Sequence, residues 1–155
     1  MPETRKAVAL SLNILSRRDH SEAELRRKLS AKGFAAEILD EVTNRLKDAG
    51  YLNDRRFAHS FAESSIRNGR GYGFRLRLEL SRRGIPAEII EDTLAALDAE
   101  YDEIATLSGL MARKFEGFDP QQADARQKRR VFSYFQRRGF SLAAIVRVFR
   151  DTESS

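Results

Sequence analysis

Apolar side chains recur at helical spacing along almost the whole chain. Val8, Leu12 and Leu15 fall on one side of a first predicted helix, and Ile38 and Val42 begin the same pattern again further on. A spacing of three to four residues places side chains on one face of an α-helix. No segment shows the strict alternation of apolar and polar residues that is typical of a β-strand. The pattern therefore predicts an all-α fold.

Several helix boundaries can be read from capping signals. Ser21 followed three residues later by Glu24 forms a capping-box pattern, in which two side chains satisfy backbone N–H groups at a helix start. Gly33 then predicts the end of that helix, because glycine readily adopts the left-handed conformation just past a helix. Further along, Asp119-Pro120 predicts the start of a longer helix, and Ser141 predicts the cap of the last one.

An internal repeat organises the chain. When residues 25–46 are aligned with residues 76–97, nine of 22 positions are identical. A third, weaker copy places Arg137-Arg138-Gly139-Phe140 on Arg82-Arg83-Gly84-Ile85. Such self-similarity is typical of arrays whose units share a continuous core. We therefore predict three tandem three-helix repeats, at residues 1–52, 53–98 and 99–155.

Composition narrows the class of protein. The chain of 155 residues has no cysteine, which excludes disulfides and thiolate metal sites. It begins without the apolar core of a signal peptide and has no stretch long enough to span a membrane, so we expect a cytoplasmic protein. The net charge of +5 favours an anionic partner such as nucleic acid, although a well-solvated surface explains it equally well.

The charges separate by predicted helix. Residues 21–32 carry four positive and two negative charges, residues 73–83 four and one, and residues 120–138 six and one. The segments 35–48 and 86–98 are acidic instead. If the repeats stack in similar orientations, the basic helices present a broken positive stripe able to contact phosphates. Cations in a last helical turn, such as Arg82 and Arg83, also favour the helix dipole without any partner.

Catalytic chemistry finds no support in the sequence. His20 and His59 are the only histidines, and neither has a second imidazole at metal-ligand spacing, so we read both as surface or packing residues. Three glycines at positions 69, 71 and 73 surround Arg70, but phosphate-binding loops of this composition follow a β-strand. We read this segment as a helix end and a turn. We expect no enzyme activity, no metal and no cofactor.

Several segments, taken together in order and spacing, resemble the RecX family. They are Arg18-Asp19-His20-Ser21 with Glu24-Leu25-Arg26-Arg27-Lys28-Leu29, Gly50-Tyr51-Leu52-Asn53-Asp54 with Arg56-Phe57-Ala58, Gly71-Tyr72-Gly73 with Glu79-Leu80 and Arg83-Gly84-Ile85, and Arg137-Arg138-Gly139-Phe140. Two positions depart from the family pattern. Asn53 stands where an aspartate is usual but can still cap a helix, and Phe74 stands where a proline commonly follows.

The resemblance implies an elongated, curved array of three-helix repeats that acts as a monomeric regulator of the RecA recombinase. Proteins similar to this one bind RecA filaments on single-stranded DNA, and they inhibit recombination, ATP hydrolysis and the co-protease role in the SOS response to DNA damage. Weak direct binding to DNA follows from the same charges. The residues that we expect to contact the filament or its DNA are Arg26, Arg27, Lys28, Arg70, Arg75, Arg77, Lys128, Arg129 and Arg130.

Two other functions remain open from the residues alone. The first is a stand-alone DNA-binding protein, because each glycine turn between the second and third helices of a repeat fits a helix-turn-helix. The second is a structural adaptor that holds a basic partner through acidic helix residues such as Glu88, Glu91 and Asp92.

Overall fold

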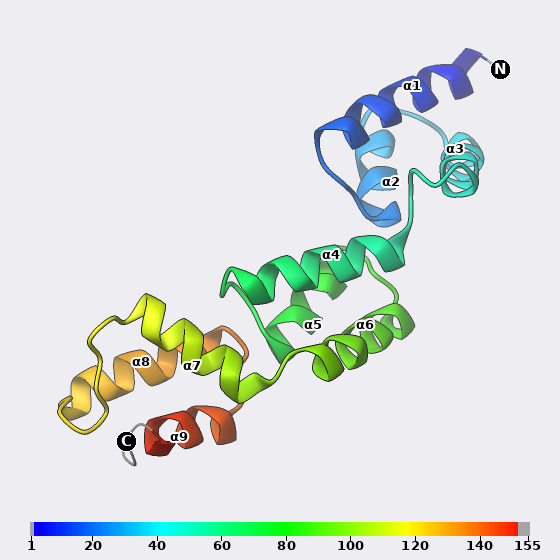
Figure 1. Cartoon of the computed structure of the whole chain (residues 1–155). Helices are drawn as coiled ribbons and strands as arrows, with labels where there is room; N and C mark the ends of the chain where they lie inside the picture. Colours follow the sequence, from blue (N-terminus) through cyan, green and yellow to red (C-terminus); the bar gives the residue numbers. More distant parts are fainter. Residues whose placement is uncertain (1, 152–155) are drawn as a thin grey trace. The chain divides into compact units, whose positions relative to one another are not determined.

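A computed structural model of the chain describes residues 2–151, and these residues form helices connected by short loops and turns (Figure 1). No strand occurs among them, which confirms the all-α prediction. None of the helices in this range has the length and apolarity needed to cross a membrane. The helices are α1 (Pro2–Arg17), α2 (Glu22–Ala31), α3 (Ala36–Asp48), α4 (Asp54–Arg67), α5 (Gly73–Arg82), α6 (Ala87–Glu100), α7 (Glu103–Lys114), α8 (Ala125–Arg137) and α9 (Leu142–Asp151).

The chain divides into two compact units. Among the described residues, the first contains 2–60 together with 80–90, and the second contains 61–79 together with 91–151. The predicted repeat boundary at 52/53 falls between α3 and α4, whereas the boundary at 98/99 falls inside α6. The three repeat boundaries stay predictions.

The first unit is built on a core between α1, α2 and α3. Leu25 and Leu29 of α2 and Val42 of α3 are fully buried there. Thr4, Ala7 and Ser11 are the buried residues of α1, and Val8 and Leu15 of the predicted apolar face are partly buried against the same core, whereas Leu12 is exposed. Small residues allow a helix to pack closely on its neighbours, and the Thr4 hydroxyl donates to Glu41 of α3 at 3.2 Å.

The second unit has a larger core that is rich in aromatic rings. Phe135 of α8 is its largest fully buried side chain, and it lies edge-on to Phe115 and Phe140. Leu107 of α7 and Ile145 of α9 are also fully buried. These contacts orient α8, whose opposite side faces solvent.

In the first unit, Gly84 allows a close contact, here called a glycine joint, between the end of α5 and the start of α2. Gly84 follows α5 with a φ of +82°, and a Cβ at this position would overlap the side chain of Ala23 at the start of α2. The hydroxyl of Ser21 donates to the carbonyl of Arg83 at 2.6 Å while also accepting the N–H of Glu24, which confirms the predicted capping box. Arg83 also binds the Glu24 carboxylate at 3.2 Å.

A second glycine joint has the same plan in the second unit. Gly139 follows α8 with a φ of +101°, and a Cβ there would overlap the carbonyl of Tyr72. The N–H of Tyr72 donates to the carbonyl of Arg138 at 2.8 Å, and its ring stacks on Phe140 at 4.8 Å. Burial, together with nearby acidic side chains, raises the pKa of the Tyr72 phenol to about 12. By contrast, a Cβ at Gly33, the matching glycine after α2, would have no atom within 4 Å.

The start of α8 corrects one prediction from the sequence. Asp119-Pro120 forms a turn, in which the carbonyl of Asp119 accepts the N–H groups of Gln122 and Ala123. The helix begins five residues later than Pro120, at Ala125. The predicted longer helix was wrong because Pro120 is buried and holds the chain in the turn.

Candidate functional site

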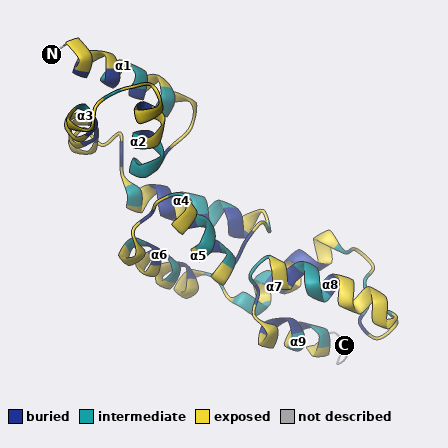
Figure 2. Cartoon of the chain, turned by 180° about the vertical axis from the view of Figure 1, so that it is seen from behind, coloured by how far each residue is buried: buried dark blue, intermediate teal, exposed yellow. Residues whose placement is uncertain are grey.

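The positively charged side of α8 is the strongest candidate for a binding surface. The helix carries five basic residues and no acidic one. All residues from 125 to 130 are exposed, and this part of α8 is yellow in Figure 2. A helix with this composition concentrates positive charge on a rigid element, as a site for an anionic partner requires.

Local sequence explains why these cations face solvent. Val131 and Phe135 are buried one turn apart, so they anchor one side of α8 in the core. Asp124 caps the helix, since its side chain accepts the N–H of Gln127 at 2.8 Å while the Gln127 side chain accepts the N–H of Asp124 at 3.2 Å. The anchored side and the cap together fix which way the remaining side chains point.

Four of the α8 cations share the solvent side. Arg126, Arg129, Arg130 and Arg137 are spaced by three, four and eleven residues from the first, a spacing that keeps them on one face. Within residues 2–151, neither these arginines nor the flanking Lys128 makes an ion pair with any acidic side chain. Their charge is therefore available to a partner.

The expected contact residues near α5 have different surroundings. Arg75 binds Glu79 one turn along the helix at 3.1 Å, and Arg77 forms an ion pair with Glu91 of α6. Exposed ion pairs of this kind are worth little in stability, but each brings a negative charge beside the arginine. Arg70 is exposed and donates to the Ser64 hydroxyl at 3.1 Å.

The expected contact residues on α2 belong to the first unit. Arg26 binds Asp40 of α3 at 2.6 Å and the Thr43 hydroxyl at 3.2 Å. Arg27 is exposed. Lys28 donates to His20 over a distance of 2.9 Å. None of these contacts tests whether the residues bind a partner, so the contact role of all nine expected residues stays a prediction.

His20 is a buried packing residue. Only 1% of it is exposed, and its Nδ1 lies 3.0 Å from the carbonyl of Arg18. Burial lowers the pKa of His20, and the positive charges of Arg18 and Lys28 act in the same direction. A neutral ring donates from Nδ1 to the carbonyl and accepts the Lys28 ammonium at Nε2. His20 thus stabilises the loop before α2.

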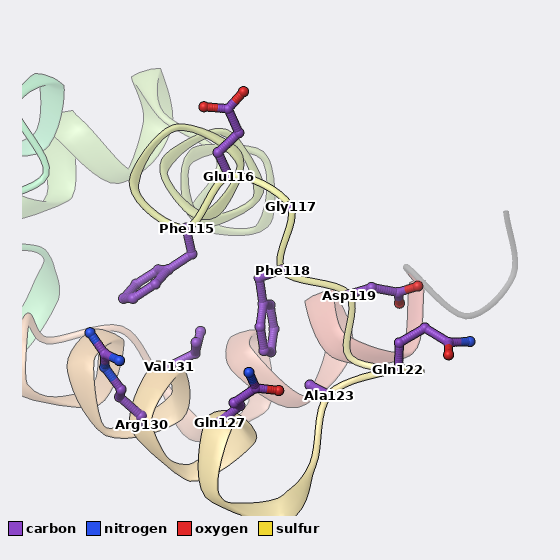
Figure 3. A pocket seen from close by; sticks show the side chains of 10 residues that line it. All are labelled: Phe115, Glu116, Gly117, Phe118, Asp119, Gln122, Ala123, Gln127, Arg130 and Val131. Carbon is purple, nitrogen blue, oxygen red and sulfur yellow. The ribbon is translucent and has the colours of Figure 1, made fainter.

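A cavity of about 340 Å³ adjoins the basic side of α8 (Figure 3). It lies between α8 and the segment that connects α7 to it. Phe115 and Phe118 point into it from the connecting segment, while Gln127 and Arg130 rise from α8 on the other side. Asp119 stands at the far end, and Glu116 points away. Arg130 is therefore shared between the cavity and the basic face.

Sequence reasoning missed part of this site. Arg126 and Arg137 were not among the expected contact residues, although their spacing from Arg129 and Arg130 was a readable signal. The cavity had no comparable signal. It arises from the turn at Asp119, which the sequence suggested would be helix.

Comparisons with known proteins bear on the family. The model of the first three-helix domain of RecX matches residues 7–46, and the model of the second matches residues 53–94. The chain belongs to the RecX family. The matched segments are thus three-helix domains in tandem, as predicted.

Curated relatives of this RecX-family chain extend over nearly its whole length. It is similar to the "Regulatory protein RecX" of Trichlorobacter lovleyi, with 43% identity and 90% of each chain covered. The corresponding protein of Syntrophotalea carbinolica is 37% identical, with 91% of this chain and 92% of the relative covered. The family is therefore regulatory by name.

Two solved RecX structures share the fold. The crystal structure of RecX from Lactobacillus salivarius superimposes with a TM-score of 0.80 at 20% identity and covers 99% of both chains. A second crystal structure of a regulatory protein RecX gives a TM-score of 0.73 at 19% identity, covering 96% of this chain and 72% of that one. At such identities, the likeness supports the fold alone.

Proposed function

We propose that this RecX-family chain binds RecA filaments on single-stranded DNA through the cations of α8 and inhibits the recombinase, ATPase and co-protease activities of the filament. The family supports a regulatory role. The observation that carries the proposal is the charge of α8. One side of this helix is buried in the core, and the helix carries five cations and no acidic residue. Within the described residues, none of these cations forms an ion pair. The chain acts by binding and performs no catalysis of its own.

A RecA filament offers the α8 cations more contacts than naked DNA does. Each phosphate that a lysine or arginine neutralises releases a counterion, which makes binding sensitive to salt. A filament presents phosphates together with a protein surface, so the same cations act there with additional contacts. We therefore expect weak binding to bare DNA and stronger binding to the filament, in the cytoplasm where both occur.

The direct test is the ATPase rate of RecA on single-stranded DNA while the chain is titrated in at substoichiometric amounts. The double variant Arg129→Glu and Arg130→Glu should shift the inhibition curve to about tenfold higher concentration or more, since two attractive contacts become repulsive. The matched control is Arg5→Glu with Lys6→Glu, because both residues are exposed on α1 and the change in net charge is equal.

The outcomes separate cleanly. If the control variant inhibits like the parent chain and the α8 variant does not, the α8 docking surface is supported. An unchanged inhibition curve for the α8 variant rules out these two arginines. No inhibition by the parent chain at any ratio rules out the proposed function itself.

A stand-alone DNA-binding protein is the second candidate, because an unpaired basic helix also suits a DNA groove. The two functions differ in what they bind. A direct reader of DNA retains sequence-dependent affinity for naked duplex as salt rises, whereas a filament regulator binds naked DNA weakly and the coated filament much better. Parallel titrations of both ligands over a range of salt concentrations decide between them.

A further inference from the structure

We propose that the cavity between α8 and the α7–α8 connection accepts one unstacked base of a single-stranded nucleic acid whose phosphates lie along the α8 cations. The inference deepens the proposed function, on which it rests, by assigning the nucleic acid strand of the partner to one cavity. It depends on three properties of the cavity: its apolar walls, its mixed polar edge and the one-sided placement of charge around it.

The apolar walls of the cavity are aromatic rings that contact the core. Phe115 lies edge-on to Tyr134 and Phe135, with ring centroids 5.1 and 5.7 Å apart. Phe118 lies 5.6 Å from the ring of Phe149. Both walls are therefore packed against rings of the core. Single-strand binding proteins use aromatic rings held in this way to stack bases of any sequence.

The polar edge offers both donors and an acceptor. The Gln127 oxygen is occupied by the N–H of Asp124, which leaves the Gln127 NH₂ group to donate into the cavity. Arg130 adds further donors beside it. At the far end, one oxygen of Asp119 accepts the N–H of Gln121 at 2.9 Å, and the other oxygen remains for a donor.

This combination distinguishes a base from simpler ligands. Base edges present hydrogen-bond donors and acceptors side by side. A phosphate would be repelled by the Asp119 carboxylate, and an apolar side chain would leave the donors of Gln127 and Arg130 unused. A volume of about 340 Å³ is at the small end of ligand pockets and suits a planar ring.

The positive charge near the cavity lies on α8, and the negative charge lies on the connecting segment. Of the α8 cations only Arg130 lines the cavity, and Arg126, Lys128 and Arg129 are exposed elsewhere on the same helix, whereas Glu116 and Asp119 belong to the connecting segment. Phosphates therefore follow α8, and the base turns from there toward Phe115 and Phe118. Arg130 lies at the rim of the cavity, where it contacts either the base or the phosphate of the same nucleotide.

The test uses a single strand of about 15 nucleotides with 2-aminopurine at its centre, which matches the upper site size of small single-strand binding domains. Fluorescence anisotropy reports binding, and the emission of 2-aminopurine reports unstacking, because stacking on neighbouring bases quenches it. With the full chain, we expect binding together with a rise in emission.

Two variants probe the cavity without removing its core residues. Ala123→Phe fills the cavity, and Ala112→Phe places the same ring on the exposed side of α7 as a control.

Gln127→Glu keeps the capping box, because glutamate serves the same role at this position, but replaces the donating NH₂ group with an oxygen. We expect Ala123→Phe and Gln127→Glu to weaken binding about tenfold and to abolish the rise in emission, and Ala112→Phe to change neither.

Measuring inhibition of the RecA ATPase with the same variants separates this inference from the proposed function. Binding without any rise in emission, or an unaltered rise in Ala123→Phe, overturns the base pocket while leaving the filament function intact. If Ala123→Phe abolishes ATPase inhibition but leaves strand binding and emission unchanged, the cavity holds a protein side chain and the inference is wrong. If the parent chain binds the strand and raises the emission as expected but does not inhibit the ATPase, only the proposed function is contradicted.

Discussion

At the scale of single residues, two glycines decide how neighbouring helices meet. Gly84 and Gly139 each follow a basic helix, and each lies where any Cβ would overlap atoms at the start of another helix. Gly33 has the same backbone conformation but an open surrounding. The three positions thus separate the cost of the left-handed conformation from the cost of close packing.

Replacing Gly139 with alanine should cost more stability than replacing Gly33. Both variants force alanine into the left-handed region, at a cost of about 1–2 kcal/mol. Gly139→Ala must also push apart Tyr72 and Arg75, which adds about 1–3 kcal/mol. Urea unfolding followed by circular dichroism measures the difference. Equal losses in the two variants would show that the joint tolerates a methyl group.

At the scale of elements, sequence reasoning succeeded where the signal is local. The capping box at Ser21 and Glu24 depends on residues three apart, and it forms as predicted. The prediction that a helix starts at Asp119-Pro120 was wrong. A second cap signal, Asp124, lies close by, and the burial of Pro120 decides between the two. Burial depends on the tertiary core, which short-range patterns do not describe.

The corrected start of α8 predicts which aspartate stabilises it. Asp124→Ala removes the side chain that accepts the Gln127 N–H and should lower the free energy of unfolding by about 1 kcal/mol. Asp124→Asn keeps an accepting oxygen and should lose only a fraction of that. Thermal or urea unfolding of the two variants, compared with the parent chain, provides the measurement. A loss in Asp124→Asn as large as in Asp124→Ala would contradict the capping role.

At the scale of the whole molecule, net charge is a poor guide to where a partner binds. The basic residues of α5 and α8 look alike in the sequence, yet Arg77 pairs with Glu91 fourteen residues away while Arg129 and Arg130 have no acidic partner among the described residues. Sequence alone could predict the basic helices and the family. It could not predict the pairing, because that depends on which helices become neighbours.

Two variants with equal charge change should therefore differ in nucleic acid binding. Arg129→Gln with Arg130→Gln should weaken binding to a single strand and reduce the slope of log affinity against log salt by about 0.7 per lost phosphate contact. Arg75→Gln with Arg77→Gln should change both quantities less, since Glu79 and Glu91 already offset these charges. Anisotropy titrations at several salt concentrations report both. Identical slopes for the two variants would mean that only total charge matters.

The glycine joints also specify the order of the segments they connect. Both joints present the carbonyl just before a glycine, but Arg83 receives a side-chain hydroxyl from Ser21 whereas Arg138 receives a backbone amide from Tyr72. A segment moved to the other joint would meet a mismatched donor and a differently shaped surface. The two joints are therefore not interchangeable, because each carbonyl is placed for the particular donor that it receives.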